Sequence, residues 1–160
     1  MTESTEQGSR SWRQFITFHS DEQEFGADIM TIREIRGWTE TTPLPHSPEY
    51  VCGVINLRGM VLPVVDLKAR LGRGATEVSA KHVIIVVRCG DQTMGLLVDA
   101  VSDILTATEN DIQVTPELAR DGQSEFIDGI AVLDERMVTI LNMERLAAML
   151  VADKGSSLAA

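Results

Sequence analysis

The segment from Gly53 to Leu67, GVINLRGMVLPVVDL, decides the fold of this chain. Two apolar runs flank the tetrad Asn56-Leu57-Arg58-Gly59, an arrangement typical of a β-hairpin. Asn at the first position and Gly at the fourth predict a type I turn followed by a bulge, because Gly accepts the positive φ that the bulge requires. Leu57 and Arg58 are therefore predicted to form the tip of the hairpin.

The predicted tip places an apolar side chain beside a fixed positive charge. Turns usually carry small polar residues, so this pairing favours a contact with a partner protein, with Leu57 as an anchor and Arg58 as the neighbouring charge. The alternative is structural: Leu57 folds back beneath a neighbouring loop and Arg58 caps a carboxylate. The tip alone leaves both interpretations open.

The composition is that of a folded domain without a nucleic-acid partner. The 160 residues suffice for one compact domain or two small subdomains with a common core. Hydrophobic residues make up 44% and aromatic residues only 4%, so an aliphatic core is expected. The net charge of −10 argues against phosphate binding, which requires clustered Lys and Arg. Residues 1–75 carry −2 and residues 76–160 carry −8, a polarity that a protein partner can recognise.

The second half of the chain repeats the first, which predicts two units of about 70 residues. The offset is 69 residues at first and 76 after a longer loop at Thr115–Glu125. Each unit is predicted to hold five short strands, as in small barrels or a sandwich. Units of this size are near the lower limit of independent stability, so the two are expected to pack together. The alignment pairs Phe15–Phe18 with Ile84–Val87, Glu34-Ile35 with Asp103-Ile104, and Gly53-Val54 with Gly129-Ile130.

These observations predict one domain between two tails. A mobile tail is expected at residues 1–13, a domain at 14–152, and a second tail at 153–160. Within the domain, subdomains are expected at about 14–75 and 80–152, with strand exchange between them left open. A closing helix is expected at Glu144–Val151, which reads ERLAAMLV.

Two local features bear on the surface. Ile29, Ile32 and Ile35 recur at every third residue, which favours a short 3-10 or α-helical turn over a strand. The two hairpin tips also diverge, since Arg58-Gly59 in the first repeat aligns with Asp134-Glu135 in the second. This divergence indicates either two different binding faces or drift in surface loops.

No group of residues indicates catalysis, a cofactor or a metal. The three histidines, His19, His46 and His82, lie outside any recognised metal or nucleophile motif. Cys52 and Cys89 are far apart and lack the CxxC spacing of a metal site. A binding protein without enzymatic activity or cofactor is therefore expected. An apolar run of about 20 residues and an export signal are both missing, so a cytoplasmic location is expected.

The string GVINLRGMVLPVVDLKARLG, with GADIMTIREIRGW before it and GLLVDAVSDIL after it, resembles the bacterial chemotaxis coupling proteins, the CheW family. The similarity extends from about Gln14 to Leu150. It implies a mainly β fold of two packed five-stranded SH3-like barrels with short helices and a C-terminal helix. It also implies an adaptor that couples the cytoplasmic tips of methyl-accepting chemoreceptors to the regulatory domain of the histidine kinase CheA, in arrays at the inner face of the membrane.

The resemblance also implies a receptor-binding groove between the barrels and a kinase contact near Leu118. Apolar side chains in the groove are expected to supply most of the affinity, while Glu34 and Arg58 fix the register by charge. Two alternatives remain: a coupling protein of a non-flagellar chemosensory pathway, and a ligand-sensing β-barrel with an interior cavity. The positions that match the groove are Ile32, Glu34, Ile35, Gly53, Val54, Leu57, Arg58, Gly59, Val101 and Ile104.

Overall fold

The computed structural model describes residues 12–114 and 125–150, which are mostly β-strand. The first half contributes β1 (Arg13–Ser20), β2 (Gln23–Asp28), β3 (Ile32–Gly37), β4 (Val51–Leu57) and β5 (Met60–Asp66). The second half contributes β6 (Val83–Cys89), β7 (Gln92–Val98), β8 (Ala100–Ala107), β9 (Ile112–Gln113), β10 (Ile127–Leu133) and β11 (Arg136–Leu141). The helical elements are the 3-10 turns η1 (Ile29–Thr31) and η2 (Glu109–Asp111), the short helix α2 (Leu67–Arg70) and a last helix at 143–150.

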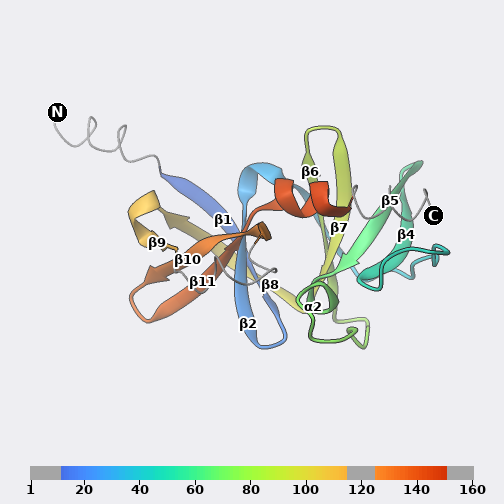
Figure 1. Cartoon of the computed structure of the whole chain (residues 1–160), viewed down its shortest axis with the longest axis horizontal. Helices are drawn as coiled ribbons and strands as arrows, with labels where there is room; N and C mark the ends of the chain where they lie inside the picture. Colours follow the sequence, from blue (N-terminus) through green and yellow to red (C-terminus); the bar gives the residue numbers. More distant parts are fainter. Residues whose placement is uncertain (1–11, 115–124, 151–160) are drawn as a thin grey trace.

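The strands form two sheets, and each sheet takes strands from both halves of the chain. The first barrel has the order β3-β6-β7-β5-β4, and the second has the order β8-β1-β2-β11-β10-β9. The two halves pair in parallel where β5 meets β7 and where β11 meets β2. They also pair in the antiparallel sense where β1 meets β8 and where β3 meets β6. Figure 1 shows the two sheets next to each other along the long axis. The predicted mainly β class with two small barrels is confirmed.

Two glycines allow the parallel contacts between the halves. Gly95 of β7 lies opposite Val64 of β5, and a Cβ on Gly95 would lie 2.7 Å from Cγ2 of Ile84. At the matching place in the other sheet, Gly26 of β2 lies opposite Ile140 of β11. A Cβ on Gly26 would lie 3.1 Å from Cγ1 of Val138 in β11. The missing side chains therefore leave room for neighbouring side chains, from β6 of the same half at Gly95 and from β11 of the other half at Gly26.

Three apolar clusters hold the fold. A shared core lies between the barrels and includes the stacked rings of Phe18 and Phe25 together with Phe126 and Leu146. Each barrel also has a smaller apolar interior of its own. The first barrel encloses Ile55, Leu57, Leu62, Val64, Ile84, Val86 and Leu97, and the second encloses Phe15, Leu105, Ala107, Ala131, Val138 and Ile140.

Of the three isoleucines at every third position, Ile29 lies in η1, as the predicted 3-10 turn requires, but Ile32 and Ile35 belong to a bulged strand, so the prediction of a helical turn is wrong beyond η1. In β3, Ile32 lies opposite Val87 and Ile35 lies opposite Ile85, with one extra residue, Arg33, between them. A β-bulge inserts one residue and so returns positions i and i+3 to the same face of the sheet. Ile32 and Ile35 therefore both lie on the side of the shared core. β8 has the same irregularity opposite β1.

The tip of the first hairpin also differs from its prediction. β4 and β5 are joined by Arg58 and Gly59 alone, whose φ angles are 51° and 87°. Positive φ at both central residues defines a type I′ turn, whose twist matches that of the strands, so no bulge is needed. Leu57 pairs with Met60 and is buried inside the first barrel. Leu57 is therefore internal, but it lies within the barrel and not beneath a loop. Arg58 pairs with the carboxylate of Glu34, and its side chain is 71% exposed.

The predicted tails lie almost entirely outside the described residues. Trp12 and Arg13 are described, and Arg13 already belongs to β1. Leu118, the residue predicted to contact the kinase, also lies outside the described ranges.

A candidate protein-binding surface

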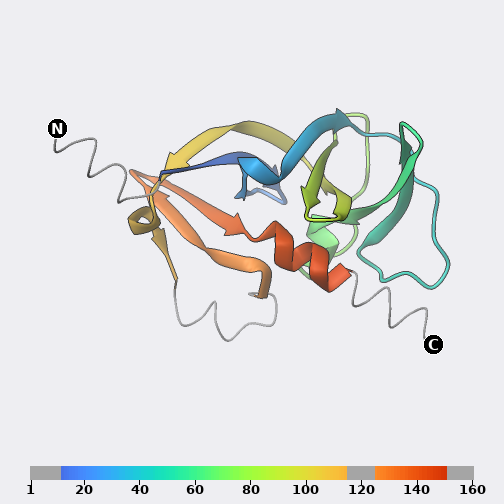
Figure 2. The same ribbon diagram turned by 90° about the horizontal axis from the view of Figure 1, so that it is seen from above.

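Four apolar residues of the predicted groove form what we call the seam: Ile32 and Ile35 of β3, and Val101 and Ile104 of β8. Ile32 and Val101 are half-buried against the shared core, whereas Ile35 is 44% exposed and Ile104 is 52% exposed. Both strands are at an edge of their sheet. Figure 2 shows β3 in blue and β8 in yellow along one side of the molecule, opposite the last helix. The duplication thus places matching apolar side chains on one side of both barrels.

Glu34 and Arg58 form an ion pair at the end of the first hairpin. Arg58 Nη2 donates a hydrogen bond to Glu34 Oε1, and Arg36 Nη1 lies 3.4 Å from Glu34 Oε2. The bond from Arg58 is the main reason why the pKa of Glu34 lies below its usual value. The carboxylate is therefore ionised at neutral pH. Because Glu34 lies opposite Val86, it is on the other face of β3 from Ile35.

The ion pair borders a hollow of about 210 Å³, which we call the first mouth. It lies at the open end of the first barrel, where the β4–β5 turn meets β3, β6 and β7. Its floor includes the buried Leu57 and Val86, and Met60 is exposed beside them. The residues that line it are Arg33, Glu34, Leu57, Arg58, Met60, Val86, Arg88 and Thr93.

The three remaining predicted residues shape the backbone. A Cβ on Gly53 would lie 2.4 Å from the carbonyl oxygen of Thr42, and Gly53 has a φ of 144°, so the position requires glycine. Thr42 and Val54 exchange backbone hydrogen bonds of 2.9 and 2.8 Å, which hold the preceding segment against β4. Gly59 faces open space and supplies the second positive φ of the turn. The predicted set therefore combines the seam, the ion pair and these backbone positions.

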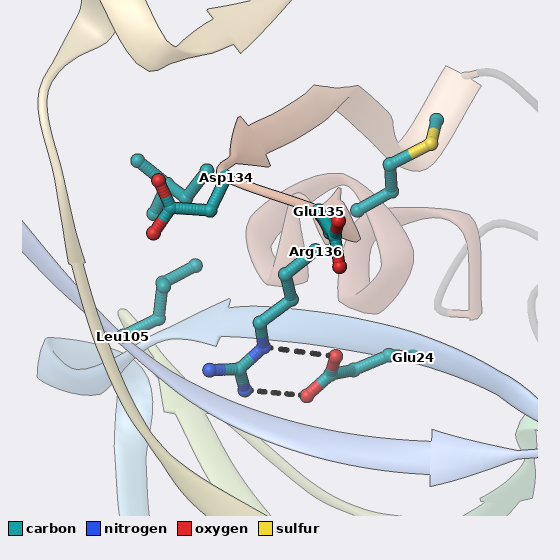
Figure 3. Close-up of a pocket in the computed structure, with 7 residues that line it drawn as sticks. Glu24, Leu105, Asp134, Glu135 and Arg136 are labelled. Carbon is teal, nitrogen blue, oxygen red and sulfur yellow. Dashed lines mark hydrogen bonds and ion pairs between the residues drawn. The ribbon is translucent and has the colours of Figure 1, made fainter.

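The second barrel holds an arginine that the sequence analysis missed. Arg136, the first residue of β11, donates to Glu24 from Nε at 3.0 Å and from Nη2 at 2.5 Å. Its Nη2 also donates to Asp103 Oδ1 at 2.6 Å and to the hydroxyl of the buried Thr17 at 3.1 Å. The Thr17 hydroxyl in turn donates to Asp103 Oδ1 at 2.5 Å. Figure 3 shows Arg136 extending from the hairpin to Glu24.

This network holds all three charges in their ionised forms. The hydrogen bond from Arg136 is the largest cause that lowers the pKa of Glu24, and it is also the largest cause for Asp103, followed by the bond from Thr17. The two carboxylates raise the pKa of Arg136. The alignment contained part of this signal, since it pairs Asp103 with Glu34. The arginine was missed because it aligns with Met60 and not with Arg58.

A wide hollow of about 770 Å³ lies beside this network, and we call it the second mouth. It occupies the same place in the second barrel as the first mouth does in the first. The β10–β11 turn at its rim has a positive φ only at Asp134, so it differs from the type I′ turn of β4–β5. The residues that line it are Glu24, Leu105, Leu133, Asp134, Glu135, Arg136 and Met137.

The described residues offer little that suits other functions. Within 12–114 and 125–150, no three His, Cys, Asp or Glu side chains are grouped so that they could hold a metal ion. Burial raises the pKa of the Cys52 thiol to about 12, which makes it a poor nucleophile. Nor do the described residues include a helix long and apolar enough to cross a membrane.

Comparisons with known proteins agree on one family. Residues 14–151 match the model of the CheW-like domain. The chain is 49% identical over 144 residues to the chemotaxis protein CheW of Rhizobium meliloti, which covers 90% of this chain and 93% of that protein. It is 52% identical over 134 residues to the probable chemotaxis protein CheW of Rhizobium etli, covering 84% and 86%. The crystal structure of the scaffolding protein TtCheW from Thermoanaerobacter tengcongensis superposes with a TM-score of 0.74 at 36% identity, covering 82% and 89%.

Proposed function

The chain belongs to the CheW-like domain family, and from this membership we propose that its seam binds the cytoplasmic tip of a chemoreceptor. The protein is a non-enzymatic coupling adaptor of chemotaxis, so the predicted function class is confirmed. The observation that carries the proposal is the exposure of Ile35 and Ile104 at matching edge strands. Exposed apolar side chains that gather on one side of a molecule are typical of a protein–protein contact.

The second proposed partner is the regulatory domain of the kinase CheA, which would place the protein in receptor arrays at the inner face of the membrane, in the cytoplasm. The family supports this arrangement. The ligand-sensing alternative is disfavoured, because apolar side chains fill the interiors of both barrels. The second mouth, at about 770 Å³, is an open surface hollow, whereas a small-molecule site usually encloses its ligand.

In this proposal the seam and the ion pair make different contributions to binding. The seam desolvates apolar surface, which supplies most of the affinity. Arg58 remains largely exposed although it pairs with Glu34, so its other donors are available to a partner and contribute to orientation and association rate. Micromolar binding, about −8 kcal/mol, suffices because an array multiplies weak contacts.

The test removes apolar surface from the seam without opening the core. In the double variant Ile35→Ser/Ile104→Ser, both changed side chains are already half exposed, so the melting temperature is expected to change little. Binding to a purified receptor cytoplasmic fragment, measured by calorimetry, is expected to weaken at least tenfold. Val78→Ser is the matched control, because Val78 is also 44% exposed but lies in the connecting segment. Unchanged binding by the double variant contradicts the proposal.

A second variant tests the charge. Arg58→Glu places a like charge beside Glu34 at a surface turn, so receptor binding is expected to weaken about fivefold or more while the fold persists. Lys81→Glu changes the net charge equally at an exposed position outside the first mouth. If Arg58→Glu unfolds the protein, the arginine is structural; if it binds like Lys81→Glu, Arg58 does not contribute to recognition.

A further inference from the structure

The second mouth combines apolar surface with carboxylates that have no partner among the described residues. Met137 is 62% exposed at its rim, Leu133 is half-buried and Leu105 is buried at its base. Asp134 and Glu135 are exposed at the turn, and no hydrogen bond or ion pair from the described residues engages their side chains. In Figure 3 the carboxylate of Asp134 points away from the Arg136 guanidinium.

Arg136 does not neutralise this rim. Its guanidinium is held by Glu24 and Asp103, which together carry one more negative charge than it supplies. The field at the second mouth is therefore negative even before Asp134 and Glu135 are counted. A surface of this kind attracts a cationic partner and disfavours an anionic one.

The first mouth shows that this charge is not a general property of the barrel. At the matching place it is lined by Arg33, Arg58 and Arg88, with Glu34 as the one carboxylate. Its exposed methionine, Met60, resembles Met137 in size and exposure. The two mouths thus share an apolar element and differ in the sign of their charge.

We propose that the second mouth is a docking site for a cationic protein segment that places one apolar side chain against Leu133 and Met137 and pairs Lys or Arg with Asp134 and Glu135. The apolar contact would supply affinity in a hollow wide enough to receive a side chain. The ion pairs would set orientation and exclude acidic segments, since like charges would face each other. The site is distinct from the seam, and it goes beyond the proposed receptor coupling.

The experiment uses the full chain, labelled with ¹⁵N, and an acetylated and amidated peptide Gly-Lys-Leu-Lys-Gly as the probe. Amide shifts are expected to move at residues 133–137 on titration, and affinity is expected to fall as salt is raised. The peptide with Ser in place of Leu is expected to bind at least fivefold more weakly. Since neither receptor nor kinase is present, the outcome does not depend on the proposed function.

A charge-matched pair of variants decides the assignment. Asp134→Asn/Glu135→Gln is expected to weaken peptide binding at least fivefold, and Asn tolerates the positive φ of Asp134. Glu40→Gln/Glu77→Gln removes two exposed carboxylates elsewhere and is expected to change affinity less than twofold. Equal losses in both variants, or shifts spread over the acidic surface, overturn the proposal. Concentration-dependent shifts at both mouths without peptide also overturn it, since the occupant would then be a second copy of the chain.

Discussion

The two mouths are built on one duplicated scaffold, yet the residues that line them carry net charges of opposite sign. Glu34 and Asp103 occupy matching positions on β3 and β8, and each bonds to an arginine from the neighbouring hairpin. In the first barrel the arginine is Arg58, in the exposed turn. In the second it is Arg136, two residues further along in the alignment and inside the strand. The carboxylate therefore has the same position in both repeats, whereas the arginine lies in the turn of the first repeat and at the start of the strand in the second.

That shift changes what each mouth offers to a partner. Arg58 has one carboxylate partner and remains exposed, so the first mouth keeps a surplus of positive charge. Arg136 has two carboxylates and the buried Thr17 as partners, so it acts inside the fold and leaves the turn acids free. Similar pairs thus leave an exposed arginine in the turn of one barrel and anchor a strand of the other.

The largest expected effect comes from exchanging Arg136 for its counterpart. Arg136→Met introduces the residue type of Met60 and leaves Glu24 and Asp103 without their cation. Breaking a partly buried ion pair costs several kcal/mol, and the partial exposure here reduces that to about 2–3 kcal/mol. Arg58→Met is expected to leave the melting temperature nearly unchanged. Urea unfolding of both variants measures the difference in the free energy of unfolding. Equal losses would contradict the inference that Arg136 stabilises the fold more than Arg58 does.

Acid is expected to destabilise the second mouth through the same groups, with an effect no larger than that of Arg136→Met. The folded-state pKa values of Glu24 and Asp103 are lowered, so the unfolded chain takes up protons first, near 4.5 and 3.8. The free energy of unfolding should therefore fall as the pH drops below about 4.5, and continue to fall until the folded-state values are passed. Urea unfolding between pH 3 and 7 should show a shallower decline for Arg136→Met. Parallel curves for the variant and the parent protein would show that the network is not the source.

A smaller effect is expected at the base of the network. Thr17→Val introduces the residue type of Val86, its counterpart in the first barrel. Arg136 and Asp103 keep each other but lose the hydroxyl, which should cost about 1–2 kcal/mol in urea unfolding. Val86→Thr, the reverse exchange, buries a hydroxyl in the aliphatic interior of the first barrel and should also destabilise. If Thr17→Val leaves the free energy of unfolding unchanged, the ion pairs do not need the hydroxyl.

The smallest effect concerns the two turns. Gly59→Glu introduces the residue type of Glu135 at a φ of 87°, which should cost about 1 kcal/mol. Glu135→Gly should cost no more than about 0.5 kcal/mol, because Glu135 has no positive φ to relieve. Thermal unfolding of both variants measures the asymmetry, and similar shifts would show that the turns tolerate the same residues.

The sequence predicted most of the fold because the duplication repeats the apolar pattern of every strand. It misjudged Ile32–Ile35, since a bulge returns every third residue to one face and imitates a helical period. It also misjudged Leu57, because the type I′ turn needs only two residues and leaves the leucine in the barrel. The Arg136 network could not be predicted, since Thr17, Glu24 and Asp103 approach Arg136 only through the three pairings that join β8, β1, β2 and β11.

Each sheet's dependence on both halves has a consequence for the origin of the molecule. A single ancestral repeat would have had its equivalent of Gly26 or Gly95 facing no strand, with half of its barrel missing. It could have closed that barrel only by lending strands to an identical chain and borrowing the same strands in return. The present fold has the strand order that such an intertwined pair of chains would have once a peptide linker joined them, and joined repeats can acquire different charges at their two ends.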